Sequence, residues 1–298
     1  MDLKGPISFD DQVHRLISHK MDIVDNDLAK QVLSEINYYR FTGYALQFRD
    51  KENPDDYLPG ASFENVFRLH QFDTELRCIL KQYLDTVELY ARSQIAYGFS
   101  LSKCLDPPHD QHYNSTNFFN KDSHNRIVIT SLDHELENNR DSLFVIHHKS
   151  KYGGRMPLWV MVELMSFTNL SKFYSAMYFS EQDAIAKNMG STRQTLKNHL
   201  HCIANLRNKV AHAGRLYNVE LNPPIMLGRS YLQHNPNIQA NTLFAYVIAI
   251  MRRIPYNADK SAFAKALTNV IVKYSDCLEL SRLGFPVDYY KLLCNEIM

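Results

Sequence analysis

The stretch FENVFRLHQFDTELRCILKQYLDTVELYARSQIAYGFSL, residues 63–101, repeats its apolar residues at spacings of three and four. No proline or glycine interrupts this pattern before Gly98, and the spacing places the repeated positions on one side of a helix. Ser62 is a suitable N-cap and Glu64 suits the first turn. We therefore expect one long helix. The repeated positions are Val66, Leu69, Phe72, Leu76, Ile79, Tyr83, Val87, Tyr90, Gln94 and Ile95.

The rest of the chain predicts an all-α fold, because its few glycines and prolines fall between long segments of helical periodicity. Further helices are expected near residues 8–19, 26–39, 127–150, 157–165, 180–190, 191 to beyond 207, 241–253 and 261–281. Residues 103–125 contain Pro107-Pro108 and little periodicity, which indicates an exposed connector or lid.

These elements suggest three consecutive parts. Residues 1–60 are expected to form an N-terminal helical segment. Residues 61–220 would form a helical core with an inserted polar loop at about 103–125, and residues 221–298 would add C-terminal helices packed on that core.

Composition narrows the classes of function. The chain has 298 residues, 45% of them hydrophobic, and a formal net charge of +1. It therefore lacks the overall positive field of an RNA-coating protein, and any RNA contact must come from local clustering. The start of the chain has no signal-peptide pattern, and no later stretch approaches about 18 uncharged apolar residues. We expect a soluble, cytoplasmic protein without a membrane anchor.

The five cysteines are widely spread and never spaced as CxxC. This distribution predicts reduced thiols, with neither disulfides nor a zinc-thiolate site. His109 with His112, and His147 with His148, lack an acid or cysteine at a consistent spacing, so we expect no metal. Gly-rich phosphate loops and GxSxG are absent from the sequence, which leaves the NTPase, dehydrogenase and hydrolase classes without support. No cofactor is expected.

The helix expected after Ser191 has two distinct faces. At about 100° per residue, one face is apolar and should pack in the core. The other is a polar ridge at i, i+4, i+7 and i+11, flanked by Arg207 and Arg215. The core positions are Leu196, Leu200, Ile203, Leu206 and Val210, and the ridge is His201, Asn205, Asn208 and His212.

Two interpretations of this ridge stay open from spacing alone. In one, Arg207 caps a helix end or pairs with an acid, and His212 is a surface histidine favoured by the helix dipole. In the other, these residues bind phosphate and move protons, since Glu, Lys and Gln are more usual on a merely solvated helix face. The five-residue separation of Arg207 and His212 corresponds to about 140° of rotation, so one copy makes a lopsided site.

Several segments resemble the Abi-like abortive-infection proteins (AbiD/AbiF group) of the HEPN superfamily. LRNKVAH, residues 206–212, resembles the RNxxxH signature of that superfamily. Three upstream blocks resemble the same family in the same order, and LGFP at residues 283–286 resembles it more weakly. The upstream blocks are INYYRFTGY at 36–44, FDTELR at 72–77 with VELYARSQI at 87–95, and PLWV at 157–160 with ELMSF at 163–167 and LSKFY at 170–174.

The resemblance implies a HEPN-like helical bundle with additional N-terminal and C-terminal helices. It further implies a homodimer whose two motif copies form one metal-independent endoribonuclease site. The implied role is to shut down an infected or stressed bacterial cell, in several relatives under the control of a small non-coding RNA partner.

The chemistry of the motif residues is compatible with RNA cleavage. Histidine titrates near pH 6.5, which suits His212 to proton transfer. The planar guanidinium of Arg207 can bind two phosphate oxygens, and Asn208 lies one turn before His212, where it can orient the imidazole or the phosphate. We expect these three residues to be catalytic. Supporting or RNA-binding candidates are His201, Asn205, Lys209, Arg215, Glu88, Arg92 and Arg40.

Two of these candidates have strong structural alternatives. Glu88 and Arg92 are spaced i, i+4, which favours a structural ion pair over a direct catalytic role. Arg40 lies among Tyr38, Tyr39 and Tyr44, where the rings could stack RNA bases or simply pack.

Three kinds of function therefore remain. The first is an RNA-cleaving toxin, and the second is the same fold used only to bind an RNA or a partner protein. A purely structural helical protein is the third, but it would leave the polar ridge unexplained.

Overall fold

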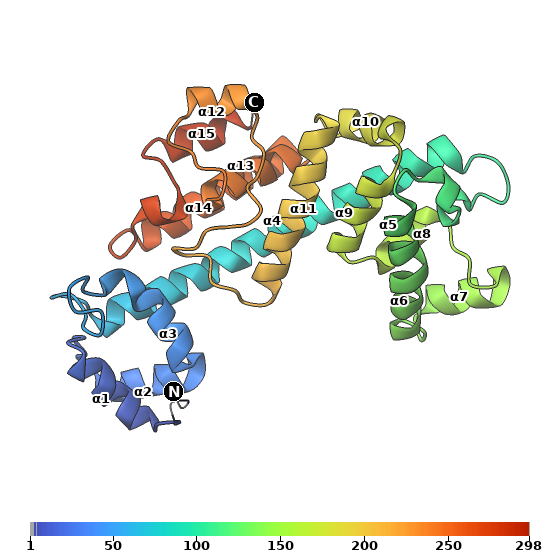
Figure 1. Cartoon of the computed structure of the whole chain (residues 1–298). Coiled ribbons are helices and arrows are strands. Elements are labelled where there is room, and N and C mark those ends of the chain that lie inside the picture. The colour runs from blue at the N-terminus through green and yellow to red at the C-terminus, as the bar shows by residue number, and fades with distance from the viewer. Residues whose placement is uncertain (1–2, 4, 298) are drawn as a thin grey trace. The chain divides into compact units, whose positions relative to one another are not determined.

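The computed structural model describes residues 3 and 5–297, and it is helical (Figure 1). Within these residues the only β-type pairings are isolated bridges, so the predicted all-α fold is confirmed. Among the described helices, none combines the length and apolarity needed to cross a bilayer. The chain divides into two compact units, each assembled from separate stretches of sequence.

Unit 1 contains the described residues up to Ile79 together with Arg215–Val219 and Lys265–Leu283. Its elements are α1 (Phe9–Ser18), α2 (Asn26–Ile36), α3 (Tyr38–Ala45), the 3-10 turn η1 (Leu46–Phe48), the start of α4 (Phe63–Lys103), the end of α14 (Asn257–Lys273) and η5 (Leu280–Leu283).

Unit 2 contains Leu80–Gly214, Glu220–Ala264 and the described residues from Gly284 onward. After the rest of α4 come η2 (Gln111–Tyr113), η3 (Ser115–Asn117), α5 (Lys121–His124), the π-helical η4 (Asn125–Ser131), α6 (Leu132–Asn138), α7 (Leu143–Tyr152), α8 (Leu158–Leu164), α9 (Phe167–Ala176), α10 (Phe179–Asn188), α11 (Arg193–Ala211), α12 (Arg229–His234), α13 (Leu243–Arg253), the start of α14 and α15 (Tyr289–Asn295).

The long helix expected from residue 63 is α4, which ends at Lys103. Ser62 caps it, because its Oγ accepts the N–H of Asn65 at 3.2 Å. Most of the repeated apolar positions are buried, as the spacing predicts. Ile79, Tyr90 and Gln94 are only half-buried.

The single helix expected for residues 26–39 is wrong, because α2 ends at Ile36. Asn37 has a φ of +52°, which a helix cannot accommodate, and its side chain accepts the N–H of Tyr39 at 2.9 Å to cap α3. Asparagine tolerates positive φ better than most residues, since its short polar side chain hydrogen-bonds locally. The apolar periodicity on either side gives no sign of this break.

Residues 103–125 are not simply an exposed connector. Cys104, His112, Phe118 and His124 are buried in unit 2. Nε2 of His112 donates to the carbonyl of Met156 at 2.9 Å, and Nε2 of His124 donates to the carbonyl of His112 at 2.6 Å. These two histidines, which looked polar in the sequence, are thus core residues whose Nε2–H groups donate to backbone carbonyls.

The centre of unit 2 is formed around α11 and α13. The apolar face predicted for α11 is buried at all five positions, from Leu196 to Val210. The helix α11 lies against α9, α10 and α13 (Figure 1). Nearly all residues of α13 are buried. The N-cap of α11 is Thr192 rather than the expected Ser191, because Oγ1 of Thr192 accepts the N–H of Thr195 at 3.3 Å.

Unit 1 is tied together by the fully buried carboxylate of Asp73 on α4. This carboxylate accepts the hydroxyl of Tyr44 at 2.7 Å and the N–H groups of Leu216 and Tyr217 at 3.1 and 2.9 Å. It also pairs with Arg77 one turn later. Burial raises the pKa of Asp73, while the hydrogen bond from Tyr44 and the charge of Arg77 oppose that rise. One carboxylate thus joins α3, α4 and the segment after α11.

We predict that Asp73→Ala destabilises the protein by about 3–5 kcal/mol, because it leaves the buried Arg77 guanidinium unpaired. The exposed Asp276, which pairs with Arg68 at 2.8 Å in the same unit, is the control. Asp276→Ala should change stability far less, since surface ion pairs contribute little. Urea unfolding of both variants measures the difference, and equal losses would contradict the role of Asp73.

We also predict that acid destabilises the protein through His112. Burial lowers the pKa of this side chain to about 4, whereas an unfolded histidine titrates near 6.5. Between these values the unfolded chain binds more protons, so stability falls as the pH drops, by about 1.4 kcal/mol per unit for this group. His112→Gln keeps a donor for Met156 and does not titrate. The loss of unfolding free energy between pH 7 and pH 5 should therefore be smaller in this variant, and an unchanged loss would exclude His112 as a contributor.

Candidate functional site

The motif arginine is anchored by a buried carboxylate on α4. Nε of Arg207, on α11, lies 3.2 Å from Oε2 of Glu88. Glu88 is only 5% exposed. Arg207 and Glu88 form an ion pair without a hydrogen bond, because Oε2 of Glu88 accepts none. Oε1 of Glu88 accepts Nη2 of Arg92, which is the i, i+4 pair that the spacing predicts. Glu88 therefore faces two guanidinium groups.

Arg92 connects this carboxylate to the corner between α8 and α9. Its Nη1 donates to the carbonyl of Val162 and its Nη2 to that of Met165, the latter at 2.7 Å. These carbonyls lie at the C-terminal end of α8, where a cation is favoured by the helix dipole. Ser166 then caps α9 by accepting the N–H of Asn169 at 3.2 Å. Arg92 is thus a positioning residue for the start of α9.

The motif asparagine is held from that same corner. Nδ2 of Asn208 donates to Oγ1 of Thr168, in the first turn of α9, at 3.1 Å. Sequence reasoning missed Thr168, because no spacing along the chain connects it with Asn208. Glu88, Arg92 and Thr168 together fix Arg207 and Asn208 within unit 2.

The motif histidine lies at the end of α11. His212 is the C-cap residue and is exposed. Its N–H donates to the carbonyl of Asn208 at 3.0 Å. The chain then turns through Ala213 at a φ of +52°, and the N–H of Gly214 donates to the carbonyl of Lys209 at 2.7 Å. A Cβ on residue 214 would lie 2.9 Å from that carbonyl oxygen, so only glycine fits this turn.

The other two ridge residues, His201 and Asn205, line two different pockets, and neither lining contains Arg207, Asn208 or His212. His201 is exposed and lines a pocket of about 410 Å³ between α9 and α11. Asn205 and Lys209 line a different pocket of about 240 Å³, together with Glu220 and Tyr246. The ridge is therefore a strip along α11 rather than one concave site.

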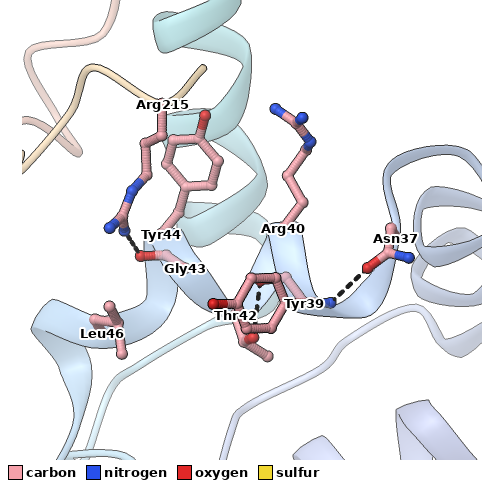
Figure 2. A pocket seen from close by; sticks show the side chains of 8 residues that line it. All are labelled: Asn37, Tyr39, Arg40, Thr42, Gly43, Tyr44, Leu46 and Arg215. Carbon is pink, nitrogen blue, oxygen red and sulfur yellow. Dashed lines mark hydrogen bonds between the residues drawn. The ribbon is translucent and has the colours of Figure 1, made fainter. Parts of the chain in front are cut away.

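Arg40 and Arg215 lie in unit 1 and line a pocket of about 520 Å³ (Figure 2). Arg215 donates to the carbonyl of Gly43, and its guanidinium lies 5.9 Å from the ring centre of Tyr44. Tyr39 lines the same pocket and is 87% exposed. Tyr39 and Tyr44 thus accompany Arg40 as the sequence suggested, whereas Tyr38 is not in the lining. The lining contains two arginines and no acid.

Among the described residues, no group of three or more histidine, cysteine, aspartate or glutamate side chains is arranged to hold a metal ion. The described cysteines are free.

A family model described as Abi-like protein matches residues 31–218. This range is more than half of the 298-residue chain, and it includes Glu88, Arg92, Thr168 and the motif from Arg207 to His212. No curated protein and no solved structure matches the chain.

We predict that Glu88→Gln lowers the free energy of unfolding by about 3–5 kcal/mol, because it removes the counter-charge of the buried Arg92. Glu163 on α8 is exposed and provides a matched control. Glu163→Gln should change stability by less than about 0.5 kcal/mol. Chemical denaturation compares the two, and a small effect of Glu88→Gln would mean that the two arginines do not depend on this carboxylate.

Proposed function

Because this chain belongs to the Abi-like protein family, we propose that it is a metal-independent endoribonuclease toxin that acts in abortive infection. Membership in the family supports the abortive-infection role. The proposed activity is carried by one observation: α11 ends with a fixed Arg207 and Asn208 followed by an exposed His212.

The anchoring of Arg207 supports a role in binding phosphate. Glu88 faces Nε, and among the described residues neither Nη1 nor Nη2 donates to a protein acceptor. The side chain is 37% exposed. Two N–H-bearing nitrogens held in a fixed plane suit the two oxygens of a scissile phosphate, on which negative charge accumulates in the transition state.

The proposed reaction needs only proton transfer and charge stabilisation. The 2′-oxygen of the RNA attacks the adjacent phosphorus, a 2′-O–P bond forms and the P–O5′ bond breaks. One group accepts the proton of the 2′-hydroxyl and another protonates the leaving 5′-oxygen. The products are a 2′,3′-cyclic phosphate and a 5′-hydroxyl. His212 is the residue of the motif suited to these proton transfers.

A homodimer completes this proposal. One α11 supplies one arginine and one histidine, whereas the reaction uses both an acid and a base. A two-fold axis beside α11 would bring His212 of each copy to a shared site. The polar strip on α11, from His201 to Asn208, would then line the approach of the RNA.

A second candidate function is RNA or partner binding with little cleavage, regulated by a small non-coding RNA. The pocket in unit 1 favours it, because an exposed Tyr39 beside Arg40 offers a ring for base stacking and a cation for the RNA backbone. This pocket is also compatible with the enzyme, as a place where substrate or a regulatory RNA is held.

We predict that His212→Ala abolishes toxicity and lowers the rate of RNA cleavage by about 10²–10⁴-fold, as expected for loss of a general acid or base. Arg207→Lys keeps the charge facing Glu88 but loses the planar fork, and should also be strongly impaired. The exposed His14 on α1 provides a control, and His14→Ala should remain toxic.

The measurement is growth arrest on expression, followed by sequencing of RNA 5′-hydroxyl ends. Undiminished cleavage by purified His212→Ala would refute the assignment. Toxicity that survives both motif substitutions would favour the binding function. The composite site would be refuted if the purified protein cleaves RNA under conditions in which analytical ultracentrifugation shows only a monomer.

A further inference from the structure

A second polar pocket lies at the start of α11, at the opposite end of this helix from the motif. Its volume is about 510 Å³, and its lining comes from the end of α10, the first turns of α11 and the end of α13, all in unit 2. Roughly 27 Å of helix separates it from Ala211. The lining residues are Lys187, Gly190, Ser191, Thr192, Thr195, His199, Arg252 and Arg253.

The unusual member of this pocket is Arg253. It is only 4% exposed, and Nη1 donates to the carbonyl of Met189 at 2.8 Å. Its Nε is buried without an acceptor, and among the described residues no carboxylate lies within ion-pair distance. Burial lowers the pKa of this group to about 10, helped by the charge of Arg252. A buried cation without a carboxylate in ion-pair distance is costly, although the charge of Glu296 opposes part of the fall in its pKa. An anion bound in the pocket would offset this cost.

The neighbouring Arg252, in contrast, has a carboxylate as its counter-charge. Its Nε and Nη2 pair with the carboxylate of Glu296 at 2.9 and 2.7 Å, and Nη1 donates to the carbonyl of Leu227. Glu296 is thus engaged by Arg252. The pocket lining itself contains three cationic residues and no carboxylate.

Two further polar atoms at this pocket are buried without partners. One is Oγ of Ser191 and the other is Nδ1 of His199, a residue with no exposed surface. Nε2 of His199 donates to the carbonyl of Met226 at 2.6 Å, so Nδ1 carries the acceptor lone pair of a neutral ring. Burial, together with the charge of Arg253, lowers the pKa of His199 to about 3, which keeps it neutral.

The start of α11 adds hydrogen-bond donors and a favourable dipole. The first N–H groups of a helix have no intrahelical acceptor, and Oγ1 of Thr192 accepts only that of Thr195. The N-terminal end of a 19-residue helix carries partial positive charge. Helix N–H groups beside hydroxyls and cations form a common phosphate-binding arrangement.

We propose that this pocket binds the phosphate group of a nucleotide. The phosphate oxygens accept from the first turn of α11, with Lys187 at the rim and the positive charge of the buried Arg253 beside them. Two kinds of ligand provide such a phosphate group: a free nucleotide and the phosphorylated end of an RNA.

Thermal unfolding and calorimetry with the full chain test the proposal, first with inorganic phosphate and then with adenosine monophosphate. Binding should raise the Tm of the wild type. Lys187→Gln removes an exposed charge and should weaken phosphate binding several-fold, and Arg253→Met should weaken it at least tenfold. Arg253→Met should not lower the Tm in phosphate-free buffer, because it removes an unpaired buried charge. Lys81→Gln, an exposed position on α4, is the control and should bind as the wild type does.

Short RNAs with a 5′-phosphate or a 5′-hydroxyl then separate the two sources, using His212→Ala protein so that the RNA stays intact. Tighter binding of the 5′-phosphorylated RNA than of adenosine monophosphate identifies an RNA end as the ligand, and the reverse order identifies a free nucleotide. The phosphate pocket is refuted if neither phosphate nor nucleotide binds, or if both bind unchanged to Lys187→Gln and Arg253→Met. Survival of binding in His212→Ala separates this result from failure of the cleavage proposal.

Discussion

The buried carboxylate of Glu88 is the interaction on which the candidate site depends. It pairs with Arg92 along α4 and faces Arg207 of α11, so one buried negative charge contacts a buried guanidinium group and a partly exposed one. An arginine orients well only when its planar group is fixed on one side, and Glu88 supplies that fixation at Nε. The other nitrogens of Arg207 stay available for a substrate.

The same cluster extends into the backbone. Because Arg92 donates to the carbonyls of Val162 and Met165 at the end of α8, it ties α4 to the corner at which α9 begins. Thr168 follows that corner and holds Asn208. The Glu88–Arg92 pair, expected to be structural, and Asn208, expected to be catalytic, are therefore parts of one network. The ion pair acts in this network by positioning the start of α9.

The helix α11 carries opposite features at its two ends. Its C-terminal end bears the motif and an exposed His212, which is the C-cap residue of the helix. Its N-terminal end meets three cationic side chains, and one of them is the buried Arg253, whose Nε has no acceptor. The buried apolar face between them, from Leu196 to Val210, fixes the helix in the core of unit 2.

The sequence by itself determined the all-α fold, the extent of α4, the buried face of α11 and the Glu88–Arg92 pair, because these depend on periodicity and on neighbours within two helical turns. Only the tertiary structure decided that Asn37 breaks a helix and that His112 and His124 are core residues. It alone brought Thr168 to Asn208, Glu88 to Arg207 and Arg253 to the start of α11. Such contacts join residues far apart in the chain, and whether a charge is buried or solvated depends on what packs around it, which no spacing records.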